Sequence, residues 1–166
     1  GIDVGYKVAK ILHAAFLDRI TPSKIIQRIN ADGRLGKKGG KGFYIYEGKN
    51  KNVDSTIYTL ISDIRKSNGE LAKEDIQDRL LFIMLIEAVH CLEEQIVRRS
   101  RDVDAGMIFG TGFPPFRGGL LKYADSLGLE LCVEKIKNLQ EKYGARFACP
   151  ELLRKMVEKN QKFYEN

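Results

Sequence analysis

Hydrophobic and polar positions alternate along most of the chain with the period of an α-helix. Apolar residues recur at helical spacing from Asp3, which is placed to cap the helix, to about Asp18, and over residues 73–98 they occupy most of the helix circumference. The same spacing, together with capping and breaking residues, predicts shorter helices at 22–30, 54–66, 100–110, 119–127, 129–143 and 150–159. The pattern therefore predicts an all-α fold whose core is centred on residues 73–98.

The longest predicted helix has one main apolar stripe, which we expect to face the core. It consists of Ile76, Leu80, Ile83, Met84, Ala88, Cys91 and Leu92, and it is broadened by Leu81, Leu85, Val89 and Ile96. Glu87 lies inside this apolar run, where an unpaired carboxylate would be costly. We therefore expect Glu87 to be buried and hydrogen-bonded, as a structural anchor rather than a general base.

Two glycine-containing segments interrupt the helices. Residues 33–42 hold five glycines and forbid a stable helix, and the aromatic residues 43–46 that follow favour a short extended segment. A polar linker at 47–52 comes next. A second polar break at 67–69 predicts a boundary between two domains, 1–68 and 69–166.

The chain also contains a diverged internal repeat. Matching residues first lie 127 positions apart: Gly1-Ile2-Asp3 with Gly128-Leu129-Glu130, Leu12 with Leu139, Phe16 with Tyr143, and Arg19 with Arg146. After one insertion they lie 128 positions apart: Pro22 with Pro150, and Ile25 with Leu153. Further along, Phe43-Tyr44 is paired with Phe163-Tyr164. Residues 73–127 precede the second copy and have no counterpart before the first. We therefore expect the chain to be a fragment cut inside a repeat.

The charge of the chain is concentrated in its first third. The 166 residues are 43% hydrophobic and 30% charged, as in ordinary globular domains, and the formal net charge is +6. Residues 1–52 carry eleven Lys and Arg against four Asp and Glu, and the remainder is nearly balanced. Four of these cations lie on the glycine-rich segment and are candidates for contact with a phosphate group of a small molecule or of nucleic acid: Arg34, Lys37, Lys38 and Lys41. The alternative is a solvated turn.

Several chemistries lack their motifs. Neither Gly40-x-Gly42 nor Gly110-x-Gly112 continues to the third glycine of a dinucleotide fingerprint, and no P-loop, HExxH or G-x-S-x-G sequence occurs. Three widely spaced cysteines and two histidines predict reduced structural thiols and no metal site, and no apolar run reaches the ~18 residues of a membrane span. The glycine- and proline-rich elbow at 110–119 contains Arg117, which either pairs with Glu87 or contacts a neighbouring domain.

Ordered motifs along the whole chain resemble the C-terminal helical domain of L-3-hydroxyacyl-CoA dehydrogenase, and more closely that of the multifunctional fatty-acid-oxidation α subunits. The motifs are Gly33-Arg34-Leu35-Gly36-Lys37-Lys38-x-Gly40-Lys41-Gly42-Phe43-Tyr44, Ile76-x-x-Arg79, Glu87-Ala88-x-x-Cys91-Leu92-Glu93-Glu94, Asp102-Val103-Asp104-Ala105-Gly106-Met107, Gly110-x-Gly112-Phe113-Pro114-Pro115-x-Arg117-Gly118-Gly119, Tyr123-Ala124-Asp125-x-x-Gly128 and Asn160-x-Lys162-Phe163-Tyr164. The resemblance implies tandem all-α domains of the 6-phosphogluconate dehydrogenase C-terminal-like type, with the first copy truncated, after a Rossmann domain.

The resemblance also implies a function for the intact protein. It would oxidise (S)-3-hydroxyacyl-CoA to 3-ketoacyl-CoA with NAD, with upstream Rossmann and enoyl-CoA hydratase domains and a thiolase β subunit as partners. It would work in the cytoplasm of a bacterium or the mitochondrial matrix of a eukaryote.

No catalytic or cofactor-binding residue is carried over to this chain. The family's catalytic His–Glu pair and active-site asparagine belong to parts upstream of Gly1. Asp78 stands at the place related to that asparagine in the second copy, and Ile86 stands where an asparagine is usual, which favours packing there. The alternative functions are a non-catalytic helical interaction module and a nucleic-acid binder that uses the basic first third.

Overall fold

The computed structural model describes the chain except residues 18, 21–22, 65–69 and 165–166. The chain forms two compact units, Gly1–Glu70 and Leu71–Asn166. Helices predominate over the described residues taken together, and strands occur only in one hairpin of that part, which confirms the predicted all-α class. The domain boundary predicted at 68/69 lies outside the described residues.

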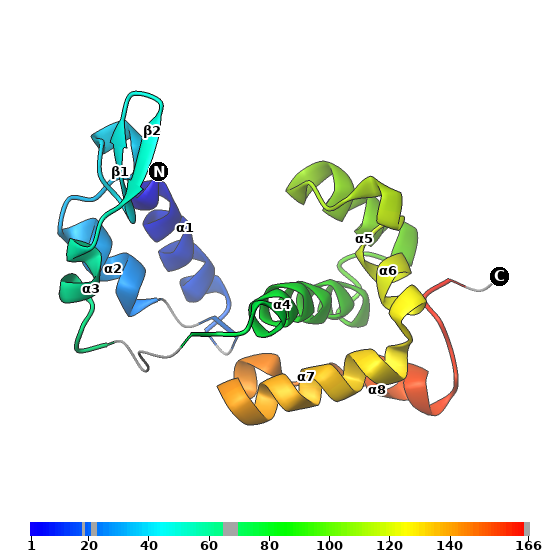
Figure 1. Cartoon of the computed structure of the whole chain (residues 1–166). Helices are drawn as coiled ribbons and strands as arrows, with labels where there is room; N and C mark the ends of the chain where they lie inside the picture. Colours follow the sequence, from blue (N-terminus) through cyan, green and yellow to red (C-terminus); the bar gives the residue numbers. More distant parts are fainter. Residues whose placement is uncertain (18, 21–22, 65–69, 165–166) are drawn as a thin grey trace. The chain divides into compact units, whose positions relative to one another are not determined.

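The described residues of the first unit form three α-helices and a hairpin. Helix α1 (Ile2–Ala15) packs on α2 (Lys24–Ala31), and α2 contacts α3 (Thr56–Leu60) (Figure 1). Asp3 does not cap α1, because the helix already begins at Ile2, and its carboxylate instead accepts a hydrogen bond from Lys38 Nζ at 2.5 Å. Ser23 caps α2, and residue 22, where this helix was predicted to begin, lies outside the described residues.

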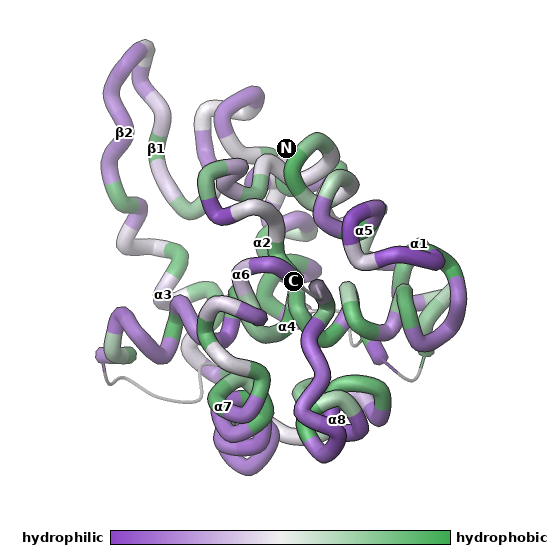
Figure 2. The backbone as a smooth tube through the Cα atoms, turned by 90° about the vertical axis from the view of Figure 1, so that its right-hand side faces the viewer, coloured by the Kyte–Doolittle hydropathy of each residue, from purple (hydrophilic) through white to green (hydrophobic). Residues whose placement is uncertain are grey.

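The glycine-rich segment leads into the hairpin. A 3-10 turn, η1 (Lys37–Gly39), precedes β1 (Tyr44–Glu47), which confirms the predicted extended segment. Strand β2 (Asn50–Val53) pairs antiparallel with β1 where the sequence predicted only a polar linker. All four residues of β2 are exposed, and the hairpin is mostly hydrophilic in Figure 2. The strand therefore has no alternating pattern that would have revealed it.

The second unit is arranged around α4 (Lys73–Glu93), as the sequence predicted (Figure 1). Helix α4 packs against α5 (Ser100–Gly106), α6 (Leu120–Leu127), α7 (Leu129–Tyr143) and α8 (Glu151–Glu158). A π-helical turn, η2 (Met107–Thr111), follows α5, and the 3-10 turns η3 (Pro115–Arg117) and η4 (Ala145–Phe147) precede α6 and α8. Helix α4 ends before 98 because the backbone turns into the left-handed region at Gln95, with φ of 58°.

The buried face of α4 differs from the stripe that the sequence favoured. Phe82, Leu85, Ile86 and Val89 are buried together with Ala88, whereas Ile76 and Leu80 of the predicted stripe are exposed. Because α4 is apolar on most of its circumference, periodicity could not select one face. The positions of α6, α7 and α8 decide which side is covered. Burial of Ile86 agrees with the packing role expected for it.

The helices that match the internal repeat have matching bounds. Helices α1 and α7 begin at Ile2 and Leu129, which are 127 positions apart, and α2 and α8 begin at Lys24 and Glu151, also 127 apart, one fewer than the offset of the aligned prolines. In each unit the two helices of the pair contact each other. That the pairs superpose remains a prediction.

Candidate functional site

The glycine-rich segment folds back on itself instead of presenting its backbone to a ligand. Each of its five glycine amides donates to a carbonyl oxygen of the loop or its immediate neighbours. The acceptors are Asn30 for Gly33, Lys41 for Gly36, Gly36 for Gly39, Lys37 for Gly40 and Tyr44 for Gly42. A phosphate cradle needs such amides to be available. These amides are already bonded within the protein.

One glycine is required by the close approach of two parts of this loop. A Cβ on Gly42 would lie 3.0 Å from the Cα of Gly36 and 3.1 Å from the side chain of Ile2. The absence of a side chain at Gly42 therefore lets the loop approach its own backbone. Sequence alone does not distinguish this use of glycine from close approach to a ligand.

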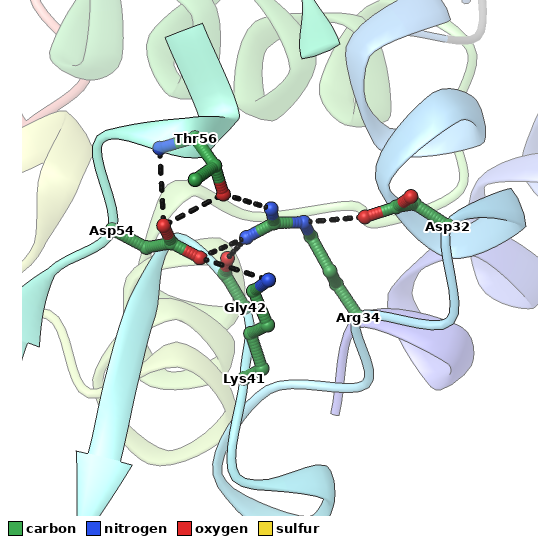
Figure 3. Close-up of polar contacts among 6 residues, drawn as sticks. All are labelled: Asp32, Arg34, Lys41, Gly42, Asp54 and Thr56. Atoms are coloured by element: carbon green, nitrogen blue, oxygen red, sulfur yellow. Dashed lines mark hydrogen bonds and ion pairs between the residues drawn. The ribbon is translucent and has the colours of Figure 1, made fainter. Parts of the chain in front are cut away.

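Arg34 lies at the centre of a buried polar network (Figure 3). Its Nη1 donates to Asp54 Oδ2 at 2.5 Å and to the Gly42 carbonyl at 3.0 Å. Its Nε donates to Asp32 at 2.7 Å, and its Nη2 donates to the Thr56 hydroxyl at 2.6 Å. Only 3% of the side chains of Arg34 and Asp54 is exposed. The guanidinium therefore joins the glycine-rich loop to the start of α3.

Asp54 is held ionised by its neighbours in this network. The Thr56 hydroxyl donates to Asp54 Oδ1 at 2.7 Å, and the Thr56 amide donates to the same oxygen at 3.0 Å. The Thr56 hydroxyl and Arg34 hold the pKa of Asp54 well below its usual range, although burial opposes this effect. Sequence reasoning missed Asp54 as a site residue, and the signal that could have found it is an aspartate at the start of a predicted helix.

The three candidate lysines lie on the surface of the same loop. Lys38 pairs with Asp3, and Lys41 Nζ lies 3.5 Å from Asp54 with about half of its side chain exposed. Lys37 is exposed in η1. Of the four cations singled out in the sequence, the structure places Arg34 inside the unit and the three lysines outside.

The expectation that Glu87 is buried is wrong. Phe82 marks the buried side of α4, and five residues at 3.6 per turn place Glu87 on roughly the opposite side. Glu87 is exposed at an apolar cavity of about 510 Å³ that α4 forms with α5 and η2, whose walls include Met84, Val103 and Met107. The carboxylate therefore avoids the cost of burial by its position on the helix.

Arg117 is exposed and lies against aromatic rings. Its guanidinium carbon is 4.7 Å from the ring centre of Tyr123 and 5.7 Å from that of Phe116. These contacts hold the elbow against α6. Pairing with Glu87 and contact with a neighbouring domain stay predictions.

The buried carboxylate of the second unit belongs to Asp104. It accepts hydrogen bonds from the amides of Leu121 and Lys122, at 2.7 and 3.0 Å, and from the Tyr164 hydroxyl at 2.7 Å. Burial and this hydrogen bond raise the pKa of Tyr164. Asp104 thereby ties α5 to the first turn of α6 and to the segment that follows α8. All of its partners are at least 17 residues away, so no local signal announced it.

The described residues do not fit a nicotinamide dinucleotide. Such a site needs a glycine-rich turn between a strand and a helix, whose N-terminus meets the pyrophosphate. The glycine-rich loop here follows α2 and enters a hairpin, and its amides are already bonded. No group of histidine, cysteine and acidic side chains suited to a metal ion occurs among the residues described. Within the same part of the chain, every helix is too short or too polar to cross a membrane.

The family model of the 3-hydroxyacyl-CoA dehydrogenase C-terminal domain matches residues 1–46 and 76–165. The chain therefore belongs to this family, as the sequence motifs predicted. One stretch of the match lies in each of the two units.

Two relatives place the family match in context. The chain is 45% identical over 167 positions to the fatty acid oxidation complex subunit alpha of Vibrio vulnificus (strain CMCP6), an alignment that covers 100% of this chain and 23% of that protein. The crystal structure of the dehydrogenase part of multifunctional enzyme 1 from C. elegans has a TM-score of 0.57 and 18% identity, and the match covers 90% of this chain and 36% of that one. This second likeness shows the fold.

Proposed function

We propose that the chain is the C-terminal helical part of a longer fatty-acid-oxidation protein that oxidises (S)-3-hydroxyacyl-CoA with NAD. Its family and its likeness to an α subunit that is more than four times longer support this proposal. The observation that carries it is the internal use of the glycine amides and Arg34, which leaves this part of the enzyme a packing role. The chain supplies a scaffold, and other parts of the protein supply the chemistry.

Because this chain is the scaffold, NAD, the acyl-CoA substrate and any hydratase activity belong to upstream domains. The intact protein is a bacterial cytoplasmic protein, and a thiolase β subunit is its partner. The loop contributes at most a surface contact to the substrate's phosphates through Lys37, Lys38 and Lys41, because the donors of Arg34 are engaged.

The chain alone is expected to be catalytically silent. It should fold with a cooperative helical melt and leave NADH absorbance unchanged in the presence of acetoacetyl-CoA. The physical reason is that hydride transfer requires a bound nicotinamide and a positioned base, and packing helices replace neither. Adding the upstream Rossmann domain and the missing half-repeat should restore turnover.

The control for this measurement is a mock preparation from the same host, which reports contaminating dehydrogenase. NADH oxidation by the chain above that background would contradict the scaffold role.

We further propose that the first unit is a truncated copy of the second. Four residues of α7 that pack inward are buried, namely Leu129, Cys132, Ile136 and Leu139. Their counterparts 127 positions earlier lie on α1, which has no buried residue: Ile2, Gly5, Ala9 and Leu12. Helix α4 covers α7 and α8, whereas α1 and α2 leave an apolar cavity of about 160 Å³ between them. A helix equivalent to α4, from upstream of Gly1, would fill this place.

Matched alanine substitutions test this truncation. In the present chain, Leu139→Ala should lower the free energy of unfolding of the second unit by about 2 kcal/mol, because Leu139 is 4% exposed. Leu12→Ala should cost under about 1 kcal/mol, because Leu12 is 42% exposed. In a protein extended upstream, Leu12→Ala should become as costly as Leu139→Ala. Denaturant unfolding followed by hydrogen exchange measures each unit separately.

The cost of Leu12→Ala in the protein extended upstream decides between the outcomes. If Leu12→Ala remains nearly neutral there, no helix covers this face and the truncated-copy proposal is wrong. Leu139→Ala serves as the internal control in both proteins.

A further inference from the structure

The second unit has an open pocket of about 580 Å³ that lies apart from the glycine-rich loop. It is formed by the end of α4, the turn into α5, α8 and the segment after α8, which is red in Figure 1 and runs back past α6. The pocket belongs entirely to the unit Leu71–Asn166.

The floor and the rim of this pocket have opposite chemistry. Apolar side chains contribute from three elements: Leu92 of α4, Leu152 and Met156 of α8, and Phe163 of the final segment. Four cationic side chains also line it: Arg98, Arg99, Arg101 and Lys162. Such a combination suits a molecule with an anionic end and an apolar body.

Two carboxylates next to pocket-lining residues, Asp102 and Glu93, are already engaged. Asp102 binds Arg99 through two hydrogen bonds of 2.7 and 3.1 Å, and Arg101 Nε is 3.8 Å from it. The carboxylate of Glu93 accepts a hydrogen bond from the Leu152 amide at 2.9 Å, and its other oxygen lies 3.0 Å from His90 Nδ1. Among the described residues, none of those that line the pocket is acidic. The described part of the rim therefore keeps a surplus of positive charge after these pairs are counted.

The wall made by the final segment is held in place by hydrogen bonds. The carboxylate of Asp125 in α6 accepts hydrogen bonds from the backbone amides of Phe163 and Tyr164, each at 3.0 Å. The Tyr164 hydroxyl donates to the buried Asp104. Lys162 and Phe163 are thereby placed opposite the arginines before any ligand arrives, which limits the entropy lost on binding.

We propose that this pocket binds an amphiphilic anion, of the class of a long-chain carboxylate, with its charged end among Arg98, Arg99, Arg101 and Lys162 and its chain on the apolar floor. Ligands of this class have in common an oxyanion attached to an apolar body. The site is independent of the catalytic role proposed above.

Fluorescence titration with cis-parinarate tests this proposal. The chain contains no tryptophan, so tryptophan fluorescence adds no background to the signal. We expect saturable binding that decanoate displaces. Decanol, which has the chain without the charge, and pyrophosphate, which has charge without the chain, should each compete at least tenfold less well. Equal competition by decanol or by pyrophosphate would overturn the amphiphile assignment, as would failure of parinarate to bind.

Charge reversals locate the binding. The double variant Arg98→Glu/Lys162→Glu should weaken parinarate binding at least tenfold. The matched control Lys7→Glu/Lys49→Glu changes the net charge equally on exposed residues of the first unit and should stay within twofold of the parent. If the reversal impairs folding, judged by the helical melt, Arg98→Gln/Lys162→Gln provides the milder comparison. Equal effects of the two pairs would place the ligand elsewhere and refute the site.

Discussion

Gly119→Ala is expected to lower the free energy of unfolding of the second unit by about 4 kcal/mol. Gly119 has a φ of 115°, in the region that L side chains rarely adopt, and a Cβ there would lie 2.2 Å from the Cγ of Asp104. Asp104 cannot move away without losing its bonds to Leu121, Lys122 and Tyr164. Strain and the loss of a buried carboxylate's partners therefore act together.

Hydrogen exchange measures this effect unit by unit, because the protection of α4 and α7 reports the second unit and that of α2 reports the first. Gly106→Ala is the matched control, since no atom lies within 4 Å of its added Cβ and its φ of −58° is ordinary. The control should be neutral or stabilising by up to about 1 kcal/mol, because alanine favours the helix. Full protection of α4 in Gly119→Ala would show that Asp104 does not hold this junction.

Arg34→Met is expected to cost the first unit about 3 kcal/mol. The substitution leaves Asp54 buried without its guanidinium, and removing one partner of a buried pair is far more costly than removing an exposed one. Lys41→Met removes the other cation next to Asp54, but the lysine is 48% exposed, so its loss should cost less than about 1 kcal/mol. Arg34→Lys should be intermediate, because a lysine retains the charge and loses the fork of donors.

The same network has a predictable response to pH. The pKa of Asp54 is lowered in the folded state, so its contribution is complete above the ordinary aspartate value of about 3.9 and is lost as pH falls below it. Urea unfolding at pH 7 and at lower pH should therefore show a loss of stability in acid that Arg34→Met reduces, while the bonds from Thr56 to Asp54 preserve the rest. An Arg34→Met protein as stable as the Lys41→Met control at pH 7 would contradict the structural role of the network.

The carboxylates of Asp54 and Asp104 show why the candidate site was only partly predictable. The sequence drew attention to Arg34 because it stands among glycines and lysines, and this pattern also occurs where phosphate is bound. Its actual partner, Asp54, lies 20 residues later. Glu87 was chosen because its sequence neighbours are apolar, yet Asp104 is the buried acid, because three donors from other segments converge on it. Burial of a charged group depends on distant partners, and these are invisible in a local window.

The sequence by itself determined the all-α class, the central position of α4, the bounds of α7 and the family, because helical periodicity, caps and ordered motifs are local properties of the chain. Only the tertiary structure decided which side of α4 is buried, that residues 50–53 form a strand, and that the glycine amides bond to their own loop. Each of these depends on contacts between segments that are separated along the chain. An apolar residue or a glycine is compatible with several such contacts, and the packed fold selects one of them.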